Sequence, residues 1–377
     1  MANLFDYLIW RGDLTLAQSP FNDVDSLILS TFSYIFFDGI VPESMTESVS
    51  AKEACEIFFD RPRAEWKARD AEDERLLMEL PKCRRFSEMQ LCGYVNQLDF
   101  AAEKQFSAMT MLLEDDTVFV AYRGTDHSLV GWKEDFNMSF MDTIPAQQEA
   151  LEYLKKVSAQ FPKKKLRTGG HSKGGNLAVY AAAMVPHAIQ MSILSVYNHD
   201  GPGFRENMLQ RAGYQMILPR VATFVPQSSV IGMLLEHEEE FTVIQSTESG
   251  FMQHDPYSWE VLGADFVRLE SLTDHSRFLD KTVKLWLDGL EEKQRECFVD
   301  TIYEAVTTAP VDAFGEVAVS PKVVFNALQA LTEEDEETKK LMGDSVKLLL
   351  QAAKQTAAEY AKVPVLGKWE RRNENEK

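Results

Sequence analysis

The chain has 377 residues, 45% of them hydrophobic and 26% charged, which is the composition of a globular protein with a sizeable core. Its formal net charge of −20 argues against nucleic acid and anionic membrane surfaces as main partners. The four cysteines show no CxxC pair, and the N-terminus shows neither the basic start nor the long apolar core of a signal peptide. We therefore expect a cytoplasmic protein with reduced thiols and no stable membrane insertion.

The first half of the chain predicts helices around one β-hairpin. Residues 1–42 are apolar and aromatic and predict a buried helix, and the charged residues 43–90 also favour helix. Residues 106–122 predict a hairpin, because two apolar runs flank a Glu-Asp-Asp turn. Residues 145–161 predict a helix, with Leu151, Leu154, Val157 and Phe161 on one face.

Strands and helices then alternate. Residues 165–170 predict a strand, and residues 176–185 predict a helix that Pro186 closes. Three more strands are predicted at residues 192–198, 220–226 and 241–246. This alternation indicates an α/β protein with a mostly parallel sheet and helices on both faces. From about residue 290 the pattern is helical only.

A serine stands in an unusually bare stretch at the junction of the first predicted parallel strand and its helix. In "TGGHSKGGNLAVYAAA", Gly170 and Gly174 lie two positions before and two positions after Ser172. A nucleophile elbow holds its serine on a strained turn, and only small residues fit at those two positions. The alternative is a glycine turn with an incidental serine. A phosphate-binding P-loop is excluded, because Ser172 and Lys173 precede the second glycine instead of following it.

Longer motifs carry a family resemblance. "VFVAYRGTDHSLVGWKEDF" followed by "GGHSKGGNLA" resembles the class 3 (fungal-type) lipases, and "NHDGPGF" and "QHDPYSW" look like a bacterial branch of that hydrolase superfamily. The resemblance covers roughly residues 1–265. It implies an α/β-hydrolase fold and ester hydrolysis through an acyl-enzyme. We expect a lipase-like domain at residues 1–290 and a helical C-terminal region with a polar tail at residues 291–377.

The resemblance also implies roles for individual residues. Ser172 matches the nucleophile, and Lys173 matches the next residue, whose backbone N–H faces the developing oxyanion. Thr125 matches the residue of the Arg-Gly-Thr motif that supplies the second oxyanion donor. Arg123 and Asp135 match a family pair that we interpret as structural, bracing the oxyanion loop.

The serine needs a base, which follows it in the chain order of this fold. That order excludes His127 and His171, and an elbow is expected to turn His171 away from the site. The histidines after Ser172 are His187, His199, His237, His254 and His275. His254 fits best, because it lies in a loop after the last predicted core strand. His275 opens a predicted helix, where capping or packing is the expected role.

The position of the carboxylate that would orient the base departs from the family pattern. In class 3 lipases it follows the second strand after the nucleophile, where this chain has Val225 to Ser229 and no carboxylate. Asp200 follows the first strand after the nucleophile, at an edge where this fold class builds its sites. We predict Asp200 as the acid. The alternative is a turn aspartate before Gly-Pro-Gly. Asp255 is too close to His254 in sequence to orient it easily.

These residues predict a serine hydrolase that cleaves a carboxylic ester, without metal or organic cofactor. The expected partner is a small-molecule acyl ester or a lipid substrate, and no nucleic acid. The alternatives are a thioesterase or amidase with the same triad, and a non-catalytic binding or scaffold protein that kept the fold. The apolar segment at residues 128–141 either shapes the pocket or is an ordinary core helix. The pattern does not determine the acyl chain, the head group or the oligomeric state.

Overall fold

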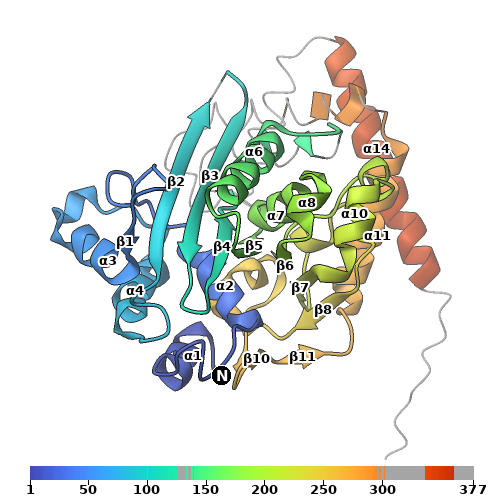
Figure 1. Cartoon of the computed structure of the whole chain (residues 1–377). Helices are drawn as coiled ribbons and strands as arrows, with labels where there is room; N and C mark the ends of the chain where they lie inside the picture. Colours follow the sequence, from blue (N-terminus) through green and yellow to red (C-terminus); the bar gives the residue numbers. More distant parts are fainter. Residues whose placement is uncertain are drawn as a thin grey trace, which may run out of the picture.

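The computed structural model describes residues 1–99, 101–125, 133–134, 137–138, 140–291, 293–295, 297–298, 301 and 336–360. A large mixed sheet forms the centre of the molecule (Figure 1), with strands in the order β1-β2-β3-β4-β5-β6-β7-β8-β11. The strands are β1 (Val49–Ser50), β2 (Gln90–Asp99), β3 (Lys104–Leu112), β4 (Thr117–Tyr122), β5 (Lys165–His171), β6 (Ile193–His199), β7 (Val221–Pro226), β8 (Phe241–Ile244) and β11 (Arg268–Leu269). A separate two-stranded ribbon pairs β9 (Val261–Leu262) with β10 (Asp265–Phe266).

The pairing of the strands changes from antiparallel to parallel and back to antiparallel across the sheet. Strands β1 to β4 pair antiparallel, strands β4 to β8 pair parallel, and β11 closes the far edge antiparallel. The carboxyl ends of β4 to β8 therefore meet at one edge of the sheet, which is where α/β proteins build their sites. With helices on both faces, this is the α/β-hydrolase fold that the sequence predicts.

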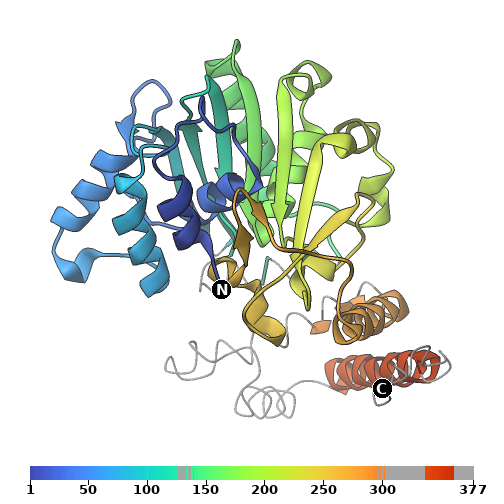
Figure 2. The ribbon, with the colours of Figure 1, turned by 90° about the horizontal axis from the view of Figure 1, so that it is seen from below.

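The helices form two layers that cover opposite faces of the sheet (Figures 1 and 2). The first layer holds α1 (Leu4–Arg11), α2 (Asp23–Phe32), α3 (Ala51–Asp60), α4 (Ala71–Glu79) and the short 3-10 turns η1 (Arg63–Glu65) and η2 (Leu80–Lys82). The second layer holds α6 (Pro145–Gln160), α7 (Lys173–Met184), α8 (His187–Gln190), α9 (Glu206–Leu209), α10 (Ala212–Ile217) and η3 (Leu218–Arg220). The loops near the site contain η4 (Ile231–Met233), η5 (Gly250–His254) and η6 (Pro256–Ser258).

Strand β4 shows how the sequence divides the core between the two layers. Its buried residues alternate, so that Phe119 and Ala121 join the apolar cluster of α1 to α4, whereas Val118, Val120 and Tyr122 join the cluster of α6 and α7. Successive side chains of a strand point to opposite faces of the sheet. From Val118 to Tyr122 this central strand has apolar or aromatic residues at every position, because both of its faces are covered.

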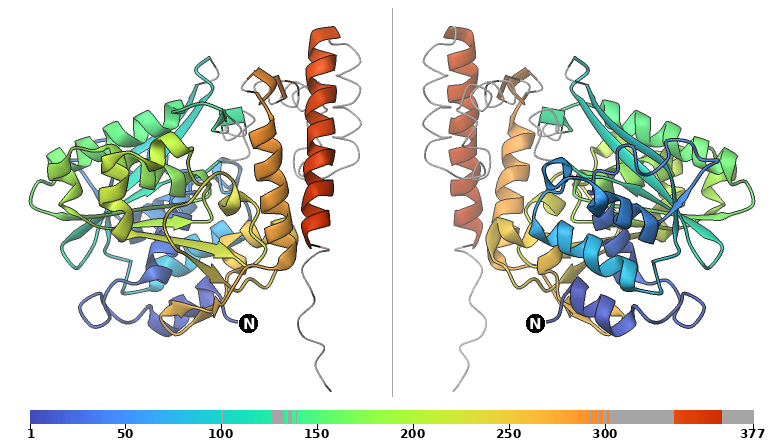
Figure 3. Two further views of the ribbon diagram at one scale, coloured as in Figure 1. Left: turned by 90° about the vertical axis from the view of Figure 1, so that its right-hand side faces the viewer. Right: turned by 90° about the vertical axis from the view of Figure 1, so that its left-hand side faces the viewer.

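Two long helices lie side by side outside this body, with α14 (Glu336–Tyr360) outermost and α11 (Asp274–Gly289) between it and the sheet (Figure 3). The Trp286 indole N–H of α11 donates to the Ser345 carbonyl of α14 at 2.9 Å, and Phe278 packs edge-on against Tyr360. At the start of α11, the Ser276 hydroxyl donates to the Ser229 carbonyl at 2.6 Å. Helix α11 ends just before the predicted domain boundary at residue 290, and it packs on α14, which follows that boundary. We therefore keep the division into two domains as a proposal.

Most of the predicted elements are confirmed, with small shifts at their ends. The hairpin, the helix from Pro145 and the strands at β5 to β8 are present. Helix α7 begins at Lys173, three residues before the predicted start, and β2 is a long strand that the pattern does not predict. Within the described part of the chain, no helix has both the length and the apolar character needed to cross a membrane.

Candidate active site

Ser172 occupies the sharp turn between β5 and α7. Its backbone has φ 58° and ψ −135°, which places a non-glycine residue in a sparsely populated region. The Ser172 N–H donates to the His199 carbonyl at the end of β6, at 2.9 Å. Strain of this kind persists only where the surroundings hold it, and it is common at functional sites. The geometry is that of a serine raised above the carboxyl edge of the sheet.

The glycines beside Ser172 are required by close backbone contacts. A Cβ added at Gly170 would lie 2.2 Å from the Gly174 carbonyl carbon, and one at Gly174 would lie 2.1 Å from the Tyr122 carbonyl oxygen. A Cβ at Gly124, in the loop after β4, would lie 3.0 Å from the Ser172 Cβ. The elbow, β4 and the loop after β4 are therefore packed backbone against backbone.

Gly174→Ala is expected to lower the free energy of unfolding by about 1–3 kcal/mol, because its methyl group has no room against the Tyr122 carbonyl. The matched control is Gly343→Ala in α14, where an added Cβ meets nothing within 4 Å. The control is expected to be neutral, or stabilising by up to about 1 kcal/mol. Urea unfolding of both variants measures the difference. Equal stability of the two would show that the turn at Ser172 tolerates a side chain at Gly174.

Asp200 and His254 are in direct contact although they are 54 positions apart in the sequence. The His254 Nδ1 lies 2.6 Å from the Asp200 Oδ2. The other carboxylate oxygen, Oδ1, accepts the Ser229 hydroxyl at 2.5 Å and the Gly232 N–H at 3.2 Å. Asp200 is fully buried and has φ 53°, so it shares with Ser172 the left-handed backbone that L-residues rarely adopt. Because the carboxylate holds Nδ1 as a donor, Nε2 is the His254 nitrogen that can accept a proton.

Asp200 also lies close to the elbow. Its own N–H donates to the Phe224 carbonyl of β7 at 2.8 Å. A Cβ added at the next residue, Gly201, would be 2.4 Å from the Ser172 carbonyl oxygen. Three of the predicted residues, Ser172, His254 and Asp200, thus come together at the carboxyl edge of β5, β6 and β8.

His171 has a supporting role in the site that the sequence does not predict. It is buried, its ring centroid lies 4.5 Å from that of His254, and its Nε2–H donates to the His254 carbonyl at 2.7 Å. The Tyr34 hydroxyl lies 3.1 Å from the His171 Nδ1. Burial, together with the neighbouring His254, holds the pKa of His171 well below its ordinary value, so the ring is neutral. His171 therefore supports the main chain that carries His254, instead of pointing away from the site.

Tyr34 is held in turn by the N-terminal helices. The Arg69 guanidinium lies over the Tyr34 ring, 3.6 Å from its centroid, and donates to both Asp73 oxygens at 2.8 and 2.7 Å. Asp73 also accepts the Tyr257 hydroxyl at 2.8 Å, three residues after His254. The layer of α1 to α4 thus holds the loop of His254 from behind. The sequence signals this support of the His254 loop only by aromatic residues, which are spread over distant segments.

The residues predicted for the oxyanion loop are placed as follows. Arg123 is buried, donates to the Asn96 Oδ1 at 2.6 Å and lies over the Phe36 ring, 4.5 Å from its centroid. Thr125 is half-buried and follows Gly124. Lys173 is the first residue of α7 and is fully buried. Asp135, the predicted partner of Arg123, lies outside the described residues, as does most of the segment at residues 128–141.

The other histidines after Ser172 occupy different places in the fold. His199 lies inside the core, where burial lowers its pKa to about 3, and its Nε2 lies 2.9 Å from the Ser26 hydroxyl. His237 contacts the Glu239 carboxylate at 2.9 Å. His187 begins the short helix α8, and His275 is the second residue of α11, as expected for a helix start.

Asp255, next to His254, predicts a pH-dependent stability. Burial raises the pKa of its carboxyl from 3.8 to about 6, and the charge of Asp70 adds to the rise. Between these two pKa values the unfolded chain releases a proton that the folded chain keeps, so stability falls as pH rises from about 4 to about 6. Asp255→Asn is expected to add about 1–2 kcal/mol at pH 7 and nothing at pH 3.5. Thermal unfolding at both pH values tests this, and an equal gain at both would contradict it.

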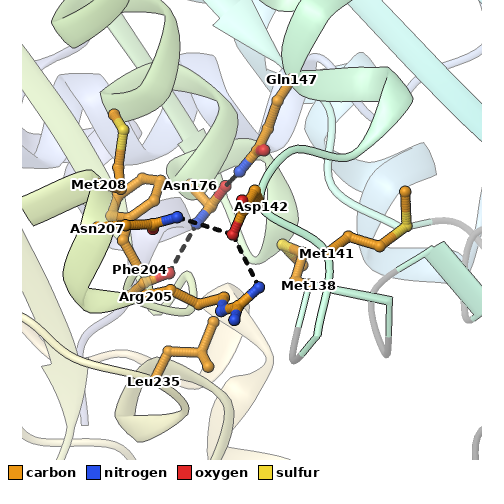
Figure 4. A pocket seen from close by; sticks show the side chains of 11 residues that line it. Met138, Met141, Asp142, Gln147, Asn176, Phe204, Arg205, Asn207, Met208 and Leu235 are labelled. Atoms are coloured by element: carbon orange, nitrogen blue, oxygen red, sulfur yellow. Dashed lines mark hydrogen bonds and ion pairs between the residues drawn. The ribbon is translucent and has the colours of Figure 1, made fainter. Parts of the chain in front are cut away.

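A small pocket lies beside the elbow helix (Figure 4). Its apolar lining includes Met138, Met141, Phe204, Met208 and Leu235. At its rim the Asp142 carboxylate accepts from Arg205 at 2.9 Å and from Asn207 at 2.7 Å. The cavity measures about 20 Å³, which is room for one water molecule.

Among the described residues, no group of three or more His, Cys, Asp or Glu side chains could hold a metal ion.

A family model described as Mbeg1-like matches residues 80–304, more than half of the chain. The chain belongs to the Mbeg1-like family. The matched range of this Mbeg1-like protein contains Ser172, Asp200 and His254. No curated protein matches the sequence significantly.

Among solved structures, this Mbeg1-like chain is similar to fungal lipases. Lipase II from Rhizopus niveus is 14% identical with a TM-score of 0.32, and the match covers 40% of this chain and 66% of that lipase. The Rhizomucor miehei lipase in its propeptide complex is 15% identical with a TM-score of 0.37, covering 64% and 79%. A triacylglycerol lipase whose catalytic centre is a serine protease triad is 15% identical with a TM-score of 0.37, covering 59% and 78%. The family match confirms the predicted relatedness to class 3 lipases. Likeness to solved structures at these TM-scores carries no argument about this chain.

Proposed function

We propose that this protein is a serine hydrolase that cleaves a carboxylic ester through an acyl-enzyme. The observation that carries the proposal is the strained Ser172 at the end of β5, beside a His254–Asp200 pair joined at 2.6 Å. A serine becomes a nucleophile when a neighbouring base takes its proton and a third group orients that base. The lipase-like fold supports the same reaction class.

In the proposed mechanism, the Ser172 hydroxyl oxygen attacks the acyl carbon while the His254 Nε2 takes its proton. The imidazolium then gives this proton to the leaving alcohol, and the acyl group stays on Ser172. Water attacks the acyl-enzyme with His254 as base again, and releases the carboxylic acid. Asp200 accepts the Nδ1–H of His254 throughout and stabilises the imidazolium.

Two backbone N–H groups are proposed as oxyanion donors, those of Thr125 and Lys173. Each such donor contributes about 3 kcal/mol to transition-state stabilisation in serine hydrolases. Support comes from the position of Lys173 directly after Ser172, and from the Gly124 loop, which packs against the Ser172 Cβ. The proposed substrate is a small acyl ester or a lipid. The proposed cytoplasmic location is supported by the buried free thiols of Cys55, Cys83 and Cys92.

Labelling with a fluorescent fluorophosphonate tests the proposal. The probe is expected to modify Ser172 in the native protein, and mass spectrometry should find the adduct on the peptide that contains it. Ser172→Ala should abolish the labelling, whereas Ser48→Ala, at an exposed position, should leave it unchanged. A folded native protein that is not labelled would favour the alternative of a non-catalytic binding or scaffold protein.

A second assay decides which bond is cleaved. Nitrophenyl esters of graded acyl length, matched thioesters and matched anilides are compared under one condition. We expect the esters to give the highest kcat/KM. A preference for thioesters or anilides would keep the triad chemistry and move the protein to the thioesterase or amidase class.

A further inference from the structure

The side chain of Lys173 has no part in the mechanism proposed above, yet it is fully buried. Its ammonium group donates to three acceptors: the Glu134 Oε2 at 2.8 Å, the Gln105 carbonyl at 3.1 Å and the Gln105 Oε1 at 2.8 Å. The residue after an elbow serine has to supply only its backbone N–H. Burying an ammonium is costly unless it is fully paired, so a lysine at this position needs an explanation of its own.

Glu134, the partner of Lys173, is equally buried and fully engaged. Its Oε2 also accepts the Gln105 N–H at 3.1 Å, and its Oε1 accepts the Ala146 N–H in the first turn of α6 at 2.9 Å. The Gln105 side-chain amide reaches the Gly124 carbonyl at 3.4 Å. The ion pair and the Gln105 side chain together connect the elbow, the start of β3, the loop of Gly124 and the start of α6.

We infer that Lys173, Glu134 and Gln105 form a buried brace that sets the positions of the two oxyanion donors relative to each other. One donor is the N–H of Lys173 itself, and the other is the N–H of Thr125, next to the Gly124 carbonyl that Gln105 contacts. This inference rests on the proposed hydrolase function. The three are positioning residues, because their side chains act through the backbone of the elbow and of the Gly124 loop.

The physical reason is the narrow tolerance of oxyanion stabilisation. The donors act only when they lie about 2.7–3.1 Å from the place that the oxyanion will occupy. Two loops that come from different strands would drift relative to each other without a rigid link. A desolvated ion pair whose polar atoms are all bonded is such a link, since each partner would be unpaired in any other arrangement.

The test compares three variants with the native enzyme. Lys173→Met leaves Glu134 buried without its partner, so it is expected to be unstable. The double variant Lys173→Met/Glu134→Gln removes both charges and keeps the volumes. Gln105→Met keeps the ion pair but removes both side-chain bonds of Gln105, the one to Gly124 and the one from Lys173. It therefore reports on the brace even if the double variant does not fold.

The readouts are the melting temperature, the kcat and KM for the best ester, and the inhibition constant of a trifluoromethyl ketone. This ketone forms a tetrahedral oxyanion with the serine. We expect the folded double variant to lose about 10- to 100-fold in kcat with little change in KM. The ketone should bind more weakly by a similar factor. Gln105→Met should show the same pattern with a smaller loss, about 3- to 10-fold.

The matched control is the buried pair of Arg85 and Asp25, whose side chains are also fully buried but lie among the N-terminal helices. Arg85→Met/Asp25→Asn is expected to lower the melting temperature and leave the kcat of the folded protein unchanged. Native kcat and ketone affinity in every variant that folds, Gln105→Met included, would overturn the brace alone. A native protein that neither hydrolyses esters nor reacts with the fluorophosphonate would overturn the proposed function instead.

Discussion

Ser172→Ala is expected to lower kcat by at least about 10³-fold while the protein stays folded. Alanine cannot form the acyl-enzyme, and the oxyanion donors and substrate binding alone give only a small residual rate. The backbone turn should survive, because alanine fits the space of serine at φ 58°. Steady-state hydrolysis of the best ester measures the loss, and circular dichroism verifies the fold.

Ser48→Ala serves as the control for this variant, because its hydroxyl is exposed and, within the described part of the chain, bonds only to Gln90. Its kcat should equal that of the native protein. A Ser172→Ala protein that is folded and fully active would contradict the hydrolase proposal. A loss in Ser172→Ala accompanied by unfolding would call for repeating the assay below the melting temperature of the variant.

Asp200→Asn is expected to lower kcat by about 10⁴-fold, which is the size of the effect of the equivalent change in serine proteases. The hydrogen bonds at Asp200 explain why. Oδ1 accepts from the Ser229 hydroxyl and the Gly232 N–H, so an asparagine would keep its oxygen there and turn its NH₂ group toward His254. The His254 Nδ1 would then have to accept, and the proton would move to Nε2. The base would be in the wrong tautomer to take a proton from Ser172.

Asp255→Asn is the matched control, since it makes the same change one residue from His254. We expect its kcat to stay within about 10-fold of the native value. The Asp255 side chain caps the N–H of Tyr257, and in the described structure it makes no hydrogen bond to the imidazole. Asp200→Ala should cost less than Ser172→Ala, because the nucleophile and the base persist. An Asp200→Asn enzyme with native kcat would show that Asp200 does not orient His254.

The elements that the sequence predicts well depend on residues a few positions apart. The hairpin of β3 and β4 follows from two apolar runs around an acidic turn, and α6 begins at Pro145, as expected from its fixed φ. Strand β2 is missed for a local reason too. Gly93 has φ +63°, and the register of β2 on β3 shifts between Cys92 and Val95, so the alternation that marks a strand is broken.

The residues of the candidate site also differ in how far they can be predicted from local sequence. Ser172 is recognisable because its small neighbours lie two positions away, and the demand for them is local. His254 and Asp200 can be nominated by the strands that they follow. Their pairing depends on 54 residues of intervening chain returning to the same edge, which no short pattern encodes. The sequence therefore leaves Asp200 open between a catalytic acid and a turn residue, and the 2.6 Å contact favours the first.

By itself, the sequence determined the class of fold, the strand–helix junction and the identity of the serine on it, because steric limits on a tight turn act between neighbours. Only the tertiary structure decided what His171 and Lys173 do. His171 meets Tyr34 across 137 positions, and Lys173 meets Glu134 across 39. A buried polar group is stable only with partners that satisfy it, and those partners are supplied by the folding of distant segments. A lysine in the same local sequence on a solvent-exposed helix would have no such role, so the local sequence does not reveal it.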